Sequence, residues 1–149
     1  MTTTRTTPAR SCPSGDATAR RVTLVIPGTP AYSLSPNSRT HWAVKQRETK
    51  EARRAVRCSM PGDVPGIWES LIVSPVKLRW TVYLAKGGKK RDNDNMLACL
   101  KAHQDGLVAW NLIPGDSPRW IPETPTVEQI VWSRHRSDPK IIVTIEEAN

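Results

Sequence analysis

The sequence has no long run of apolar residues. Its longest apolar stretches are short, such as residues 141–145, whereas a membrane-spanning helix needs about 20 consecutive apolar residues. We therefore expect no membrane contact. A chain of 149 residues, of which 38% are hydrophobic, can bury the core of one ordinary domain and is too short for two large ones.

Acidic residues and cysteines are also scarce. The chain has 14 Asp and Glu against 22 Lys and Arg, so its formal charge is +8 and its sequence pI about 9.9. Nucleic acid is favoured over acidic lipid as the polyanionic partner, because no basic stretch also carries a strong apolar face. The three cysteines, Cys12, Cys58 and Cys99, are odd in number and far apart, which predicts a reducing cytoplasm.

Several catalytic patterns are missing. The run Gly87-Gly88-Lys89-Lys90 lacks the earlier glycine and the following Ser or Thr of a phosphate-binding loop. Cys99 and His103 are four residues apart and could share a metal, but no second ligand pair accompanies them. No Ser-His-Asp or Cys-His set has supporting context, so no organic cofactor is expected.

The pattern of the chain predicts a tail and one domain. Residues 1–20 are rich in Thr, Arg, Pro and Ser with one acid, which indicates a disordered basic tail; an organellar transit peptide is the alternative. Residues 21–149 form the domain. Within it we expect the order β-α-β-α-β-β, an α/β fold with a mixed sheet covered by two main helices.

The bounds of these elements follow from periodicity and from capping and turn residues. Alternation from Arg21 onward predicts a strand. Thr40 is a plausible cap for a basic helix, and Asp94 for a second helix. Ser137-Asp138-Pro139 predicts a hairpin turn between the last two strands. The expected ranges are a helix over 42–58, a loop over 60–75, a strand over 77–84, a helix from Asp94 to about 110, and strands over 128–133 and 140–145.

A local reversal of charge marks the most informative segment. Asp92, Asp94, Asp105 and Asp116, four of the 14 acids, lie within about 25 residues of a basic chain. At about 100° per residue, Asp94, Lys101 and Asp105 share one narrow stripe of the second helix. The apolar residues of that helix fall on the opposite side and are expected to pack against the sheet.

The pair Asp92 and Asp94 favours a hard divalent metal. Two close carboxylates repel each other unless they share a cation, and Mg²⁺ takes one or two carboxylates while keeping several waters. Mn²⁺ is the expected substitute. Such a metal can activate water against a phosphodiester, and Lys101 on the same stripe could orient the water or stabilise developing charge.

An ordinary structural interpretation fits the same spacing. Asp94 can be an N-cap, Asp92 a turn residue, and Lys101 with Asp105 an i,i+4 ion pair. Likewise, the stripe of Arg47, Lys50, Arg54 and Arg57 can be a solvated helix face. Spacing alone leaves both interpretations open.

Taken together, these residues resemble a known family. Arg91-Asp92-Asn93-Asp94-Asn95, Lys101, Asp105-Gly106-Leu107 and the segment 113–118 are similar to the RusA-like Holliday junction resolvases of bacteria and their phages. The loop Ser35-Pro36-Asn37-Ser38-Arg39 is also similar to an early segment of that family. The resemblance covers residues 21–146.

The resemblance implies a homodimeric, Mg²⁺-dependent endonuclease that nicks four-way DNA junctions symmetrically. Its active site would fall on Asp92, Asp94, Lys101 and Asp116, with the three aspartates as metal ligands and Asp105 in support. Two positions depart from the family pattern. Lys101 follows Asn95 by six positions where a shorter family pattern has three, and Gly115 stands where the family commonly has the first of two adjacent aspartates.

The expected function is therefore resolution of branched DNA in a bacterial or phage-infected cell. Two alternatives remain open: a non-catalytic branched-DNA-binding protein of the same fold, and an RNA-directed nuclease. Phosphate contacts, which give steep salt dependence, are expected from the basic helix, the preceding loop and the turn before the acidic segment: Arg39, Arg47, Lys50, Arg54, Arg57, Lys86, Lys89, Lys90 and Arg91.

Overall fold

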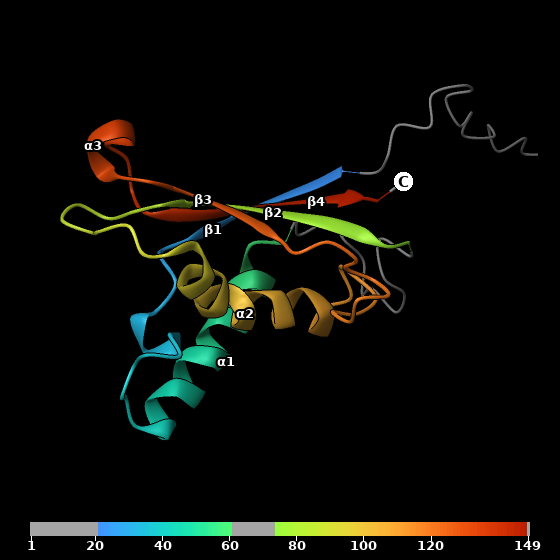
Figure 1. Ribbon diagram of the computed structural model, residues 1–149, viewed down its shortest axis with the longest axis horizontal. Coiled ribbons are helices and arrows are strands. Elements are labelled where there is room, and N and C mark those ends of the chain that lie inside the picture. The colour runs from blue at the N-terminus through green and yellow to red at the C-terminus, as the bar shows by residue number, and fades with distance from the viewer. Residues whose placement is uncertain (1–20, 61–73, 149) are drawn as a thin grey trace, which may run out of the picture.

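A four-stranded mixed sheet carries both long helices on one side (Figure 1). The computed structural model describes residues 21–60 and 74–148, so the expected tail over 1–20 and most of the expected loop over 60–75 lie outside the described residues. The elements in chain order are β1 (Arg21–Pro27), the 3-10 turn η1 (Tyr32–Leu34), α1 (Trp42–Cys58), β2 (Val76–Tyr83), α2 (Asn93–Ala109), β3 (Thr126–Ile130), α3 (Trp132–His135) and β4 (Lys140–Glu147).

The sheet confirms the α/β class but corrects the connection of its last two strands. Its strand order is β1-β4-β2-β3, with β2 parallel to β3 and antiparallel to β4. β3 and β4 therefore flank β2 on opposite sides, and the expected hairpin at 137–139 is wrong. The short helix α3, which the alternation over 128–133 did not predict, follows β3 where the chain must cross the end of β2.

Strand alternation and helix periodicity build the core as expected. Leu78, Trp80 and Val82 of β2 are at most 1% exposed and face the helices, because successive strand residues point to opposite faces. From α2, Met96 and Leu100 belong to the same apolar cluster. Burial of this surface is the main force that holds α1 and α2 against the sheet.

A glycine allows the two long helices to approach closely. A Cβ at Gly106 of α2 would lie 3.1 Å from Val56 Cγ2 and 3.2 Å from Arg53 Cα of α1. Any larger residue there would separate the helices, so Gly106 fixes their contact.

The helix starts differ from the expected caps. α1 covers the predicted 42–58, but its N-cap is His41, whose Nδ1 accepts a hydrogen bond from the Ala43 N–H at 3.2 Å. Thr40 instead bonds to Ser38 through its hydroxyl. α2 begins after Asp92, so Asp94 lies in its first turn and is not the cap. Both errors are shifts of one or two residues, which is the usual uncertainty of a helix boundary.

No helix among the described residues is long and apolar enough to span a bilayer.

Candidate functional site

The acidic motif lies at the start of α2, after the turn that follows β2. Asp92 occupies the N-cap position without a side-chain capping bond, and Asp94 is in the first helical turn. Both side chains are exposed, and neither pairs with a cation within residues 21–60 and 74–148. The partial positive charge of the helix start favours carboxylates at this place.

Gln129 of β3 fixes the backbone beside these carboxylates. Its Oε1 accepts from the Arg91 N–H at 2.9 Å, and its Nε2 donates to the Arg91 carbonyl at 2.6 Å. Nε2 also lies 3.3 Å from Asn93 Oδ1. Because Gln129 is only 7% exposed, these bonds form away from bulk water and hold the chain on both sides of Asp92.

The loop that precedes α1 meets the start of α2. Nδ2 of Asn37 donates to Oδ1 of Asn95 at 3.2 Å, across 58 residues of sequence. The structure therefore places the loop 35–39, with the exposed Arg39, beside the acidic motif. Two segments that carry the family resemblance are neighbours in space.

The second half of α2 carries a network of paired charges. Lys101 Nζ is 3.0 Å from Asp105 Oδ1 and also forms a close ion pair with Asp116. Asp105 has a second, longer pair with Arg53 of α1, at 3.8 Å. The i,i+4 ion pair of the ordinary interpretation is thus present, and Asp116 joins it from the segment that follows α2.

This ion pair shifts the pKa of both Lys101 and Asp116. Partial burial alone would lower the pKa of Lys101, but the hydrogen bonds and charges of Asp116 and Asp105 raise it. The hydrogen bond from Lys101 and its charge hold the pKa of Asp116 below its ordinary value. Both groups are therefore charged at neutral pH.

The three expected metal ligands do not form one group. Lys101 follows Asp94 by seven positions, which is about 10.5 Å along a helix, and Asp116 is at the Lys101 end. Among the described residues, no set of three or more His, Cys, Asp or Glu side chains is placed to hold a metal. Asp92 and Asp94 alone still fit Mg²⁺, which commonly takes one or two carboxylates and completes its shell with water and phosphate.

Trp120 explains the glycine at position 115. A Cβ on Gly115 would lie 2.7 Å from Cδ1 of Trp120, a separation that a real side chain does not adopt. An aspartate at this position therefore requires the indole to move. The family's first aspartate and this tryptophan exclude each other in the observed arrangement.

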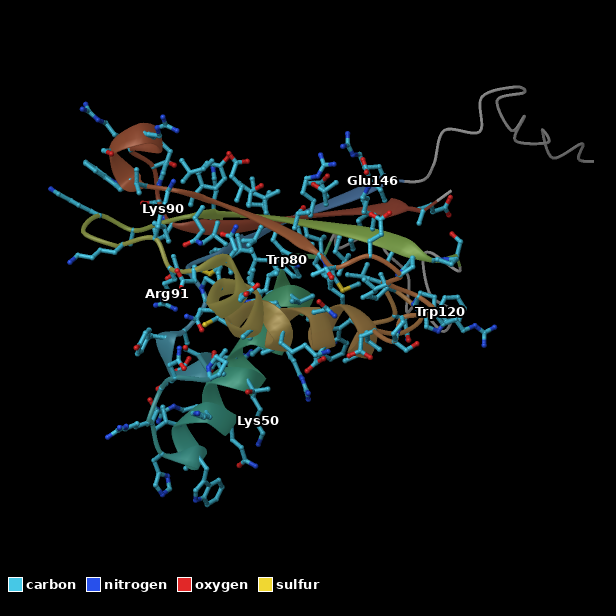
Figure 2. All side chains as sticks on the ribbon, in the orientation of Figure 1. Lys50, Trp80, Lys90, Arg91, Trp120 and Glu146 are labelled. Atoms are coloured by element: carbon cyan, nitrogen blue, oxygen red, sulfur yellow. The ribbon has the colours of Figure 1, made fainter. Side chains whose placement is uncertain are left out.

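Most of the predicted phosphate-contacting residues are exposed cations. Arg39, Arg47, Lys50, Arg54, Arg57, Lys86, Lys89 and Lys90 are all exposed. Figure 2 shows Lys90 beside the end of the sheet and Lys50 on α1, further from the sheet. The basic side chains thus occupy two separate surfaces, the turn before α2 and the helix α1.

Arg91 differs from the other eight cations. It is half-buried, with its guanidinium 4.6 Å from the Tyr32 ring centroid and its Nη1 3.5 Å from Cys99 Sγ. These contacts tie the acidic motif to η1 and to α2. In this arrangement Arg91 supports the site rather than a phosphate.

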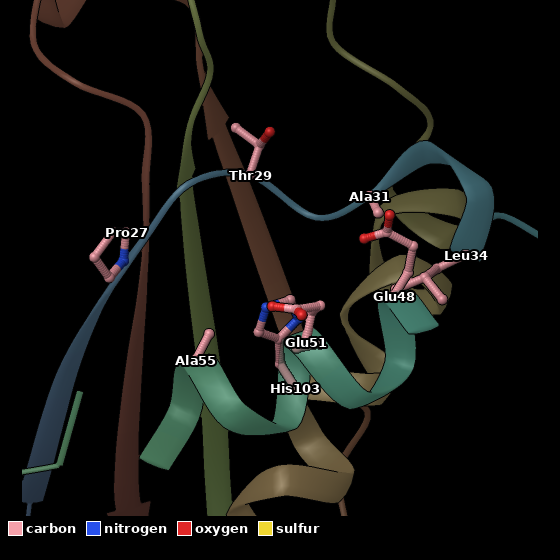
Figure 3. Close-up of a pocket in the computed structure, with 9 residues that line it drawn as sticks. Pro27, Thr29, Ala31, Leu34, Glu48, Glu51, Ala55 and His103 are labelled. Carbon is pink, nitrogen blue, oxygen red and sulfur yellow. The ribbon is translucent and has the colours of Figure 1, made fainter. Parts of the chain in front are cut away.

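A hollow of about 180 Å³ lies between α1 and the segment that follows β1. Figure 3 shows Glu48 and Glu51 of α1 on this hollow, together with the His103 ring of α2. His103 is 5% exposed, burial lowers its pKa to about 4, and its Nδ1 has no hydrogen-bond partner within the described residues. The ring is therefore neutral at neutral pH.

One bacterial protein is similar to this chain in sequence. A protein of Xylella fastidiosa (strain Temecula1), described as an uncharacterized protein, is 31% identical over 120 residues, which cover 77% of this chain and 71% of that protein. The chain belongs to the family of this Xylella protein. No family model matches the chain.

Within this family member, sequence reasoning missed two residues that shape the candidate sites. Gln129 lies in a strand whose alternation was recognised, but nothing in the sequence shows which loop its amide meets. Trp110 directly follows α2, and no sequence motif distinguishes it from the other tryptophans. Its indole Nε1 donates to the Arg53 carbonyl of α1 at 3.0 Å, a contact across 57 residues.

Proposed function

We propose that the protein is a RusA-like, Mg²⁺-dependent endonuclease that resolves four-way DNA junctions in bacterial or phage-infected cells. One observation supports it above the others: two exposed carboxylates without ion pairs among the described residues, Asp92 and Asp94, stand at the start of α2 in a strongly basic chain. Gln129 holds the backbone beside them near the carboxyl ends of β2 and β3. Carboxyl ends of strands next to a parallel neighbour are common ligand positions in α/β sheets.

In this proposal Asp92 and Asp94 would hold the metal, whereas Asp116, which pairs with Lys101, stays outside this pair. The metal would lower the pKa of a bound water and offset negative charge on the phosphate. Lys101, held in its charged form by Asp105 and Asp116, would stabilise additional charge on the phosphate oxygens. Gln129 would keep Asp92 in place through the Arg91 backbone.

The substrate would be held through its phosphates. The exposed cations of α1 and of the turn 86–90 lie on two surfaces, which suits DNA that presents more than one duplex arm. Affinity would then fall steeply with salt. A homodimer is part of the proposal, because two symmetric cuts need two active sites.

A non-catalytic branched-DNA-binding protein is the second candidate. The ion pairs of Lys101 with Asp105 and Asp116 favour it, since they engage one expected metal ligand and leave no group of three metal-binding side chains among the described residues.

Cleavage of synthetic DNA by the purified protein tests the proposal. We expect Mg²⁺-dependent nicking of a four-way junction in preference to three-way and linear duplexes. Asp92→Asn should abolish cleavage while junction binding persists, because it removes a ligand charge and leaves the basic surfaces unchanged.

Asp138→Asn is the matched control, because Asp138 is an exposed aspartate in the turn before β4, and it should cleave like the original protein. Binding without cleavage in Mg²⁺ and in Mn²⁺ would establish the non-catalytic alternative. Preferential cutting of RNA duplexes would indicate the RNA-directed nuclease.

A further inference from the structure

An open groove lies between the second half of α1 and the end of α2. It has a volume of about 460 Å³ and is lined by Lys50, Arg53, Arg54, Arg57, Cys58 and Trp110. Four of these six side chains are cations and none is acidic. Its charge therefore fits an anion.

Trp110 gives the groove a fixed aromatic wall. The hydrogen bond from its Nε1 to the Arg53 carbonyl, at 3.0 Å, anchors the indole to α1. The Arg57 guanidinium lies over the ring, 4.6 Å from its centroid. Because a guanidinium stacked on an aromatic ring keeps its N–H edge available for phosphate, Arg57 is held ready for a ligand.

The remaining cations of the groove are weakly engaged. Among the described residues, the Arg53 side chain has only the long ion pair with Asp105, at 3.8 Å. Lys50 and Arg54 are exposed and make no ion pair within the part of the chain that the structure describes. A bound phosphate would thus displace little existing interaction.

We propose that this groove binds a single-stranded stretch of DNA. Proteins that bind single strands combine a basic groove for the backbone with aromatic or guanidinium planes on which bases stack, and the Arg57–Trp110 pair supplies such a plane. A duplex keeps its bases paired and stacked inside, so it could use the cations but not this plane. The binding needs neither metal nor hydrolysis, and so goes beyond the proposed function.

In this site Lys50 and Arg54 contact backbone phosphates, and an unpaired base lies against the Arg57–Trp110 pair. Cys58 makes up part of the lining. Unpaired nucleotides of this kind are available at strand breaks, flaps and opened branch points.

Anisotropy of fluorescein-labelled oligo(dT) in EDTA, compared with a labelled duplex of equal length, tests the inference. We expect the protein to bind oligo(dT), Arg57→Gln and Trp110→Leu each to weaken that binding about tenfold, and duplex affinity to fall clearly less. Oligo(dT) should also quench tryptophan fluorescence in the original protein, and Trp110→Leu should remove most of that quenching.

Arg119→Gln is the matched control, because Arg119 also lies over a tryptophan, 4.9 Å from the Trp120 ring centroid, but outside the groove. It should change oligo(dT) affinity by less than about twofold, since a single exposed phosphate contact contributes modestly. Thermal melting identifies a variant that fails to fold; if Trp110→Leu unfolds, Arg57→Gln and Trp110→Phe decide, with Trp110→Phe retaining most of the binding.

Three results would overturn the proposal: no binding of oligo(dT), equal losses for Arg57→Gln and Arg119→Gln, or equal losses for oligo(dT) and duplex. All measurements are made without metal, so they do not depend on cleavage. A protein that binds oligo(dT) but never cuts would refute the proposed nuclease and keep this site.

Discussion

The two ends of α2 carry similar side chains in opposite electrostatic states. At its start, Asp92 and Asp94 are exposed and have no ion pair with the described residues. In its second half, Asp105 and the neighbouring Asp116 are both paired with Lys101. One helix thus has two unpaired carboxylates at its start and a network of ion pairs near its end.

This difference shows which carboxylates are available to a cation. Two close and unpaired carboxylates gain energy when a cation comes between them. Asp116 gains less, since Lys101 already supplies the positive charge. A metal is therefore expected first at the start of α2, and the predictions below break or sharpen this contrast.

The largest effect is expected on metal binding. Replacing both Asp92 and Asp94 with Asn removes the charge at the start of α2 and should weaken Mn²⁺ binding by more than about tenfold, since loss of even an outer-shell partner commonly costs 10–100-fold. Asp105→Asn should leave the affinity within about twofold. Water-proton relaxation by Mn²⁺ measures both, and an equal loss in the two variants would contradict the contrast.

The sequence pattern predicted which side chains share one face of α2, but not that Asp116 pairs with Lys101. The stripe of Asp94, Lys101 and Asp105 follows from helical periodicity, and the structure places Lys101 against Asp105 as spacing allows. Asp116 reaches Lys101 through a proline-rich segment without periodicity, so only the resemblance connected them. Gln129 and Trp110 act through contacts across 38 and 57 residues, which local pattern does not encode.

The order of the strands in the sheet could likewise not be predicted from the sequence pattern. Each strand was recognised from its alternation, but alternation does not say which strands pair. The turn residues 137–139 favoured a hairpin, whereas β2 pairs with β3 on one side and with β4 on the other. The turn residues alone therefore did not determine which strands pair.

Acid should loosen the buried side of α2 through His103. Its pKa is about 4 in the folded protein and 6.5 for an exposed histidine, so the unfolded chain takes up a proton between these values that the folded chain does not. The free energy of unfolding should therefore fall by roughly 3 kcal/mol as the pH drops from 6.5 to 4, with little further loss from this residue below pH 4.

Urea unfolding at several pH values measures this effect, and His103→Leu is the comparison that isolates it from carboxylate protonation. The variant should lose less stability over the same pH range. If both proteins show the same pH dependence, His103 is not the cause.

Removing the Gln129 side-chain amide should disturb one end of α2 and spare the other. Gln129→Met leaves the Arg91 N–H and carbonyl without their partners and should cost about 1–3 kcal/mol of unfolding free energy. Mn²⁺ affinity should fall as well, because the backbone beside Asp92 is no longer fixed. Denaturant titration and Mn²⁺ relaxation check the two effects.

Gln104→Met is the matched control, because Gln104 is a partly buried glutamine of α2 whose side chain makes no hydrogen bond to the described residues. It should leave Mn²⁺ affinity unchanged. Gln129→Glu keeps an acceptor for the Arg91 N–H and should recover part of the stability. A loss of stability without any loss of Mn²⁺ affinity would limit Gln129 to a purely structural role.

The smallest effect on stability is expected from Lys101→Met, which would make the second half of α2 resemble its start. The ion pairs of Lys101 are about half exposed, and such pairs contribute at most about 1 kcal/mol.

The pKa of Asp116 should rise toward its ordinary value, since the Lys101 hydrogen bond and charge hold it low. The stability that Asp116 contributes at neutral pH, which the original protein loses as pH falls through that lowered pKa, should then be absent. A carboxyl NMR titration would show the shift, and Mn²⁺ relaxation would show a second, weaker binding site at Asp105 and Asp116. If Lys101→Met adds no Mn²⁺ binding at Asp105 and Asp116, an unpaired carboxylate near this helix is not a metal ligand for that reason alone. The difference in ion pairing between the two ends of α2 would then not predict where a metal binds.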